Sequence, residues 1–127
     1  MTKPVRTKVF FDGGCRPNPG AMECAVVVGG EAHVRTDLGI GSSHDAEWLG
    51  LIEALRVARA RDLKDFVLLG DALAVIAVLE GRAKPVASAL THLATFRALA
   101  GTDRVSVRYI KRAQNLAGVA LGRLHPR

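Results

Sequence analysis

The spacing of the hydrophobic residues first changes close to residue 45, from a strand pattern to a helix pattern, and this change limits the folds available to the chain. From Trp48 onward, apolar side chains recur at intervals of three and four residues, which predicts an amphipathic helix over residues 45–61. Upstream, segments rich in β-branched residues are separated by glycine-containing turns, a pattern typical of strands. We expect an antiparallel meander with strands at residues 5–11, 23–28 and 31–38 and a loop at 13–20.

Downstream of this helix, strand and helix patterns alternate. Residues 66–69 form a short apolar run and residues 105–110 alternate apolar with polar side chains, so both segments are expected to be strands. Further helices are expected at residues 72–80, 85–99 and 115–124. Because strands separated by helices need crossover connections, the later strands should pair parallel to the first. The order βββαβααβα predicts an α/β fold in which helices flank a mixed five-stranded sheet.

The length of the chain suits one domain. A core of ordinary size can form from 127 residues, so we expect a single domain over residues 1–127. The longest uninterrupted apolar run, residues 72–79, is far shorter than the roughly 20 residues that cross a membrane. No charged start precedes an apolar signal segment, so we expect a cytoplasmic protein with no membrane partner. The sequence points to no particular protein partner.

Several side chains that could be reactive are expected to be structural. Cys15 and Cys24 lack the spacing of metal ligands and are expected to be small buried residues. Trp48 belongs to the apolar stripe of the long helix and is expected in the core. No partner is identified for His33 or His92.

Positive charge is concentrated near the end of the sequence. Eighteen Lys and Arg against twelve Asp and Glu give a formal net charge of +6, and residues 104–127 contain basic residues but no acid. A basic segment on an otherwise balanced chain favours a polyanionic partner, with nucleic acid the first choice. The alternative is a solvated basic surface that only improves solubility.

Three carboxylates lie where the expected elements begin or end. Asp12 ends the first strand, Asp71 ends the fourth strand, and Glu47 lies in the first turn of the long helix. If these two strands are neighbours, Asp12 and Asp71 project at one edge of the sheet, and the helix can bring Glu47 between them. In the alternative interpretation, Asp71 caps the following helix and Glu47 only interacts favourably with the helix dipole.

A cluster of carboxylates would have a defined chemistry. Like charges repel, so burying them together is costly unless a cation neutralises them. Ligand sets made only of oxygen select hard cations such as Mg²⁺ or Mn²⁺. Such a site favours metal-assisted phosphoryl transfer, with two ions about 4 Å apart on one phosphate.

Four segments resemble, in order, the motifs of ribonuclease H type 1. Residues 11–20 read FDGGCRPNPG and resemble its D-G-[GS]-x-x-x-N-P-G motif, and residues 46–55 read AEWLGLIEAL and resemble its A-E-x-x-A-[LI]-x-x-A-L helix. Gly70-Asp71 stands where the family has S-D-S, and residues 109–115, YIKRAQN, resemble its V-x-R-x-x-N segment. The resemblance covers nearly the whole chain and implies the ribonuclease H-like fold of the compact members that lack a basic handle.

The resemblance implies a function and a set of site residues. Asp12, Glu47 and Asp71 would be catalytic and would bind Mg²⁺ or Mn²⁺ as the cofactor. The implied reaction is two-metal-ion hydrolysis of the RNA strand of an RNA/DNA hybrid, leaving a 3′-hydroxyl and a 5′-phosphate. In the family, the glycine-rich loop contacts the minor groove and its 2′-hydroxyls. The implied nucleic-acid-binding residues are Gly13, Gly14, Cys15, Asn18, Ser42, Ser43, Lys111, Arg112 and Asn115.

The chain departs from the family pattern at positions that bear on catalysis. The family has a fourth metal-binding carboxylate four residues after the Asn, where this chain has Val119. Ala72 and Leu73 follow Asp71, where the family has Ser and a polar residue. Two functions therefore stay open: a metal-dependent endonuclease with reduced activity, or a non-catalytic nucleic-acid-binding module on the same fold.

Overall fold

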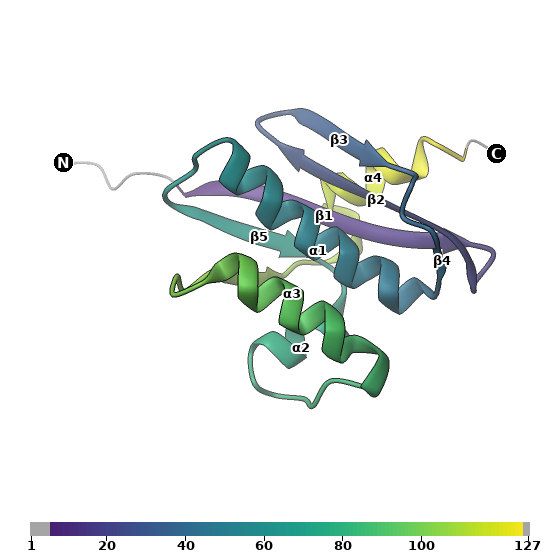
Figure 1. Cartoon of the computed structure of the whole chain (residues 1–127). Helices are drawn as coiled ribbons and strands as arrows, with labels where there is room; N and C mark the ends of the chain where they lie inside the picture. Colours follow the sequence, from purple (N-terminus) through teal and green to yellow (C-terminus); the bar gives the residue numbers. More distant parts are fainter. Residues whose placement is uncertain (1–5, 126–127) are drawn as a thin grey trace.

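A computed structural model describes residues 6–125 as a mixed β-sheet with helices on both faces (Figure 1). The sheet order is β3-β2-β1-β5-β6, and the short β4 pairs with β2. The strands are β1 Thr7–Arg16, β2 Gly20–Val28, β3 Glu31–Arg35, β4 Ile40–Gly41, β5 Phe66–Gly70 and β6 Ser106–Tyr109. The helices are α1 Ser43–Ala60, α2 Leu73–Leu79, α3 Leu90–Ala100 and α4 Leu116–Gly122, with 3₁₀ turns at Ala87–Ala89 and Arg112–Gln114. None of the helices within residues 6–125 has the length and apolar character needed to span a membrane.

The strand pairing confirms the expected meander and crossovers. β1 pairs antiparallel with β2, and β2 pairs antiparallel with β3. β5 pairs parallel with both β1 and β6. The prediction of a loop over residues 13–20 is wrong in its first half, because residues 13–16 extend β1 and pair with residues 21–24 of β2. β4 adds a two-residue strand that the sequence pattern did not indicate.

Two helices, α1 and α3, begin two or more residues from their expected positions. α1 begins at Ser43 because Ser42 is its N-cap: the Ser42 hydroxyl accepts from the backbone N–H of Asp45, and the Asp45 carboxylate accepts from that of Ser42. α3 begins at Leu90, five residues later than the pattern predicts. The delay arises because Val86 is extended and residues 87–89 form a 3₁₀ turn.

The main core lies between the sheet and α1, which crosses its near face in Figure 1. Trp48, as expected, is fully buried there. A smaller cluster lies between the other face of the sheet and α4. Cys15 and Cys24 are both buried and free, also as expected.

Two histidines have partners that the sequence pattern did not reveal. His92 Nε2 lies 2.9 Å from Asp45 Oδ1, and His33 Nε2 lies 3.1 Å from an Arg61 side-chain nitrogen. Both contacts join residues distant in the sequence, and the first forms because α3 packs against α1.

Candidate active site

The register of two parallel strands places Asp12 and Asp71 at the same level. Phe10 of β1 lies opposite Leu69 of β5, and each aspartate follows two residues later. Both carboxylates therefore leave the sheet at the same edge. The sequence pattern predicts that Asp12 ends its strand. This prediction is wrong, because β1 continues to Arg16 alongside β2.

Two glycines allow α1 to approach β1 closely enough to bring Glu47 to this edge. A Cβ on Gly13 would lie 1.9 Å from the carbonyl oxygen of Ala46, and a Cβ on Gly50 would lie 2.8 Å from that of Asp12. No side chain fits in either place, so helix and strand pack backbone against backbone. Glu47 follows Ala46 directly and lines the same cavity as Asp12 and Asp71, which we call the carboxylate cavity.

The three carboxylates act on one another electrostatically. Burial, then the charge of Asp71, raises the pKa of Asp12 to about 6, and Glu47 adds to this shift while Arg112 opposes it. Burial and the charge of Asp71 likewise raise the pKa of Glu47 to about 7. These are the shifts expected when like charges are brought together out of water. Perturbed groups of this kind gather at functional sites.

Asn115 fastens Asp71 to β1. Its side-chain N–H donates to Asp71 Oδ1 at 2.9 Å and to the carbonyl oxygen of Phe11 at 3.0 Å. Its amide oxygen accepts from the backbone N–H of Ala117 and caps α4. The resemblance implied that Asn115 binds nucleic acid, but the structure buries it completely and uses both ends of its amide internally.

The end of β1 and the turn that follows it are tied to the start of α1. Asn18 Oδ1 accepts from the backbone N–H of Ser43 at 3.0 Å, and Cys15 Sγ lies 3.5 Å from both Asn18 Oδ1 and Ser43 Oγ. Gly14, Cys15 and Ser43 line the carboxylate cavity, while Asn18 is exposed beside it. These expected nucleic-acid-binding residues therefore lie together beside the cavity, with Cys15 buried among them, and Ser42 lies next to them as the α1 cap.

The carboxylate cavity has a volume of about 380 Å³. Its walls include two basic residues, Arg16 and Arg112, and a further acid, Glu23, which the sequence pattern had not singled out. Lys111 is exposed next to Arg112. The signal that could have identified Glu23 is its position opposite Gly14 in the β1–β2 pairing, which the expected loop at residues 13–20 concealed.

Helix α4 contributes space, but no acid, to the cavity. The position nearest Asp12 is Gly118, where a Cβ would lie 3.5 Å from Asp12 Oδ2. Val119, which stands where the resemblance places a fourth carboxylate, is 49% exposed and does not line the cavity.

The buried Trp48 holds His44 next to Glu47. The indole N–H of Trp48 donates to His44 Nε2 at 3.2 Å. An indole nitrogen is only a donor, so Nε2 must accept, and in the neutral ring Nδ1 carries the proton. His44 Nδ1 lies 3.7 Å from Glu47 Oε1, which is near the carboxylate but beyond hydrogen-bond distance.

The donor chemistry of the three carboxylates fits a hard divalent cation. The three side chains offer only oxygen atoms as ligands. Burial and the charge of Asp71 raise the pKa of Asp12 and of Glu47, and the positive charge of a bound cation would oppose this shift. Within residues 6–125, no three His, Cys, Asp or Glu side chains form a ready metal-binding cluster. Asp12, Glu47 and Asp71 would thus have to draw together around an ion.

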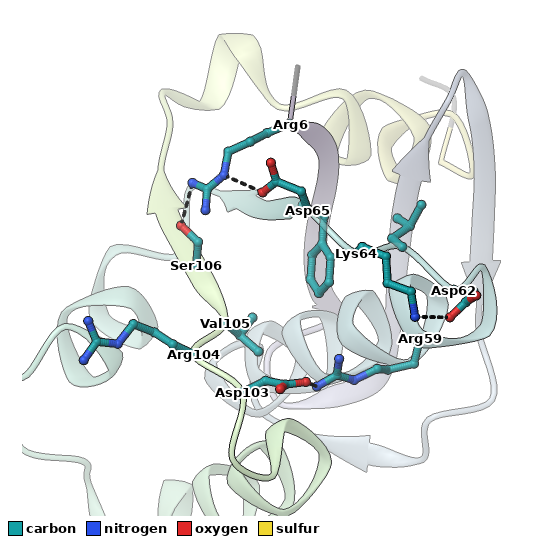
Figure 2. Close-up of a pocket in the computed structure, with 11 residues that line it drawn as sticks. Arg6, Arg59, Asp62, Lys64, Asp65, Asp103, Arg104, Val105 and Ser106 are labelled. Carbon is teal, nitrogen blue, oxygen red and sulfur yellow. Dashed lines mark hydrogen bonds and ion pairs between the residues drawn. The ribbon is translucent and has the colours of Figure 1, made fainter. Parts of the chain in front are cut away.

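Two larger cavities lie at the opposite end of the sheet, with volumes of about 520 and 670 Å³. Figure 2 shows the first of them, where charged side chains pair with one another. Arg6 Nε lies 3.0 Å from Asp65 Oδ1, and an Arg59 nitrogen lies 2.9 Å from Asp103 Oδ2. Because these acidic and basic side chains neutralise one another, we place the site at the carboxylate cavity, where acidic side chains gather.

Comparison with known proteins agrees with this fold. The model of the family described as reverse transcriptase-like matches residues 11–124. Ribonuclease H1 of the halophilic archaeon Halobacterium salinarum is 30% identical in sequence, with a TM-score of 0.81 over 92% of this chain and 94% of that one. The comparison with curated proteins finds no match.

Two more distant structures share the fold. The N-terminal ribonuclease H domain of a Mycobacterium tuberculosis protein is 24% identical, with a TM-score of 0.77 over 97% of this chain and 100% of that one. LC11-RNase H1, isolated from compost by a metagenomic approach and solved in complex with an RNA/DNA hybrid, is 20% identical, with a TM-score of 0.81 over 91% of this chain and 93% of that one. The chain belongs to the reverse transcriptase-like family and, within it, to the ribonuclease H1-like domains without a handle.

Proposed function

We propose that this protein is an endonuclease that hydrolyses the RNA strand of RNA/DNA hybrids with Mg²⁺ or Mn²⁺. The observation that carries the proposal is the meeting of Asp12, Glu47 and Asp71, from three separate parts of the fold, in one cavity. Burial, together with the neighbouring charges, raises the pKa of Asp12 and of Glu47 there. Membership of a family that includes ribonuclease H1 supports it.

The proposed roles follow from position. Asp12 and Asp71 would hold the divalent cations, and Glu47 would support one of them and orient the attacking water. When bound, the two ions would supply positive charge to the transferring phosphoryl group and activate the water. Asn115 keeps Asp71 in place, and Trp48 holds His44 with its Nδ1 near Glu47.

The loop and the basic residues would hold the hybrid. Gly14, Cys15 and Asn18 lie beside the cavity, where the loop could follow the minor groove and its 2′-hydroxyls. Arg112 lines the cavity and Lys111 is exposed beside it, so both could neutralise backbone phosphates. The same surface would serve a non-catalytic binding module. Val119, Ala72 and Leu73 favour that alternative, because apolar residues stand where the family has acidic or polar ones.

The test is cleavage of a labelled RNA/DNA hybrid, with Mg²⁺ and Mn²⁺ supplied separately. We expect metal-dependent cleavage that is lost in Asp12→Asn and kept in Asp62→Asn, which makes the same change at an exposed residue paired with Lys64. Hybrid binding without cleavage in either metal would instead establish the binding module. Cleavage that persists unchanged in Asp12→Asn would refute the assigned site.

A further inference from the structure

Glu23 lies on the same face of the sheet as Asp12. In the β1–β2 pairing, Asp12 is opposite Ala25 and Gly14 is opposite Glu23. Alternate residues of a strand share a face, so Asp12, Gly14 and Glu23 all face α4. The Glu23 side chain is only 12% exposed, and it lines the carboxylate cavity.

No large side chain lies between Glu23 and Asp12. The position between them on β1 is Gly14, where a Cβ would meet only a methyl group of Leu121 at 3.8 Å. Helix α4 contributes Gly118, Leu121 and Gly122 to the cavity wall. Neither α4 nor β1 therefore places a polar side chain between the two carboxylates.

The charges of the cavity are unbalanced. Four carboxylates line it, and the basic residues among its walls are Arg16 and Arg112. The charges acting most strongly on Asp12 come from Asp71, Glu47 and Arg112, so Glu23 stands outside that inner group. Its carboxylate is held by His125, whose Nε2 lies 2.5 Å from Glu23 Oε1.

We infer that Glu23 is a fourth cation-holding carboxylate of the site, which with Asp12 binds a second, weaker divalent cation on the α4 side. His125 acts as a positioning residue that keeps Glu23 beside the cavity. The acid comes from β2, whereas α4 presents Gly118 to Asp12 and carries Val119 outside the cavity. This inference rests on the proposed function, because it assumes that Asp12, Glu47 and Asp71 hold the first cation.

The test is direct measurement of Mn²⁺ binding to the intact protein without nucleic acid, by titration calorimetry and by electron paramagnetic resonance of free Mn²⁺. We expect two binding events in the native protein. Glu23→Gln should weaken the second event at least tenfold and leave the first unchanged. Glu31→Gln, which also removes one charge and one ion pair but lies outside the cavity, should leave both events unchanged.

A second variant separates charge from folding. Glu23→Asp keeps the negative charge on a shorter side chain, so it should retain the second event with an affinity between those of the native protein and Glu23→Gln. Equal second-event affinities in Glu23→Asp, Glu23→Gln and the native protein would overturn the inference.

The outcomes also separate this inference from the proposed function. If Glu23→Gln binds both ions like the native protein while Asp12→Asn binds neither, the role of Glu23 is refuted and the first site stands. If Asp12→Asn also binds Mn²⁺ like the native protein, the proposed function fails together with the inference.

Discussion

The side-chain N–H of Asn115 lies 2.9 Å from Asp71 Oδ1, so a residue at the start of α4 fixes a carboxylate at the end of β5. The same nitrogen donates to the carbonyl oxygen of Phe11, the residue before Asp12. One buried amide therefore holds together the two strands that carry the aspartates. It also makes the carboxylate cavity depend on where α4 begins.

Replacing Asn115 with Ala should destabilise the fold. The substitution leaves a buried carbonyl without its donor and removes the α4 cap, at a cost of about 1–3 kcal/mol for the first and about 1 kcal/mol for the second. We expect the free energy of unfolding in urea to fall by about 2–4 kcal/mol. Gln114→Ala, at the exposed neighbouring position, is the control and should change it by less than about 0.5 kcal/mol. An equal loss in both variants would contradict the role given to Asn115.

Replacing Gly13 with Ala should separate α1 from β1. The added methyl group would lie 1.9 Å from the Ala46 carbonyl oxygen, and backbone atoms on both sides must move to relieve the clash. We expect a loss of about 3 kcal/mol in the free energy of unfolding, together with weaker Mn²⁺ binding as Glu47 moves away from Asp12.

The control for this substitution is Gly122→Ala. Nothing lies within 4 Å of a Cβ on Gly122, which ends α4. That variant should be unchanged or more stable by up to about 1 kcal/mol, because alanine favours helix. If Gly13→Ala is as stable as Gly122→Ala, the close packing of α1 on β1 does not constrain the site.

The positions of the three inner carboxylates could be predicted from the sequence because they depend on element order. Asp12 follows the part of β1 that pairs parallel with β5, Asp71 follows β5, and Glu47 lies near the start of the helix with the clearest periodicity. The order of elements alone brings such positions to one edge of a mixed sheet. The fold class followed from the same patterns.

Glu23 and Asn115 could not be assigned in this way, because their roles depend on pairing and helix phase. Residues 13–16 carry two glycines and precede a proline-rich turn, so the pattern favoured a loop and concealed the cross-strand neighbour of Glu23. The burial of Asn115 depends on where α4 starts and how it rotates. The same rotation turns Gly118, rather than Val119, toward Asp12.

Without divalent cations, the protein should lose stability as the pH rises from about 4 to about 7. The folded state raises the pKa of Asp12 to about 6 and that of Glu47 to about 7, so it binds protons that the unfolded chain releases at lower pH. This contribution is fully present below the unfolded pKa values and is lost as the pH passes through the folded ones. We expect the free energy of unfolding to fall by roughly 2–4 kcal/mol, because partial exposure to solvent reduces the full effect.

The measurement is urea unfolding in a chelator at a series of pH values. Asp12→Asn should flatten the part of the curve near pH 6, whereas Asp62→Asn, at an exposed site, should follow the native protein. Added Mn²⁺ should restore stability at the high-pH end, where the carboxylates are charged and can bind it. A native-protein curve that rises over this range in the chelator would contradict the clustering of the carboxylates.

Binding of an RNA/DNA hybrid should depend on salt through Lys111 and Arg112. Each basic residue that neutralises a phosphate adds about 0.7–0.9 to the negative slope of log affinity against log salt concentration. We therefore expect Lys111→Ala and Arg112→Ala each to reduce that slope by about this amount, measured by fluorescence anisotropy in a chelator. Arg82→Ala, at a residue that pairs with Glu80 and does not line the carboxylate cavity, should keep the native slope. The same slope in all four proteins would place the hybrid on another surface, while a reduced slope only in the first two would locate its backbone beside Asp12.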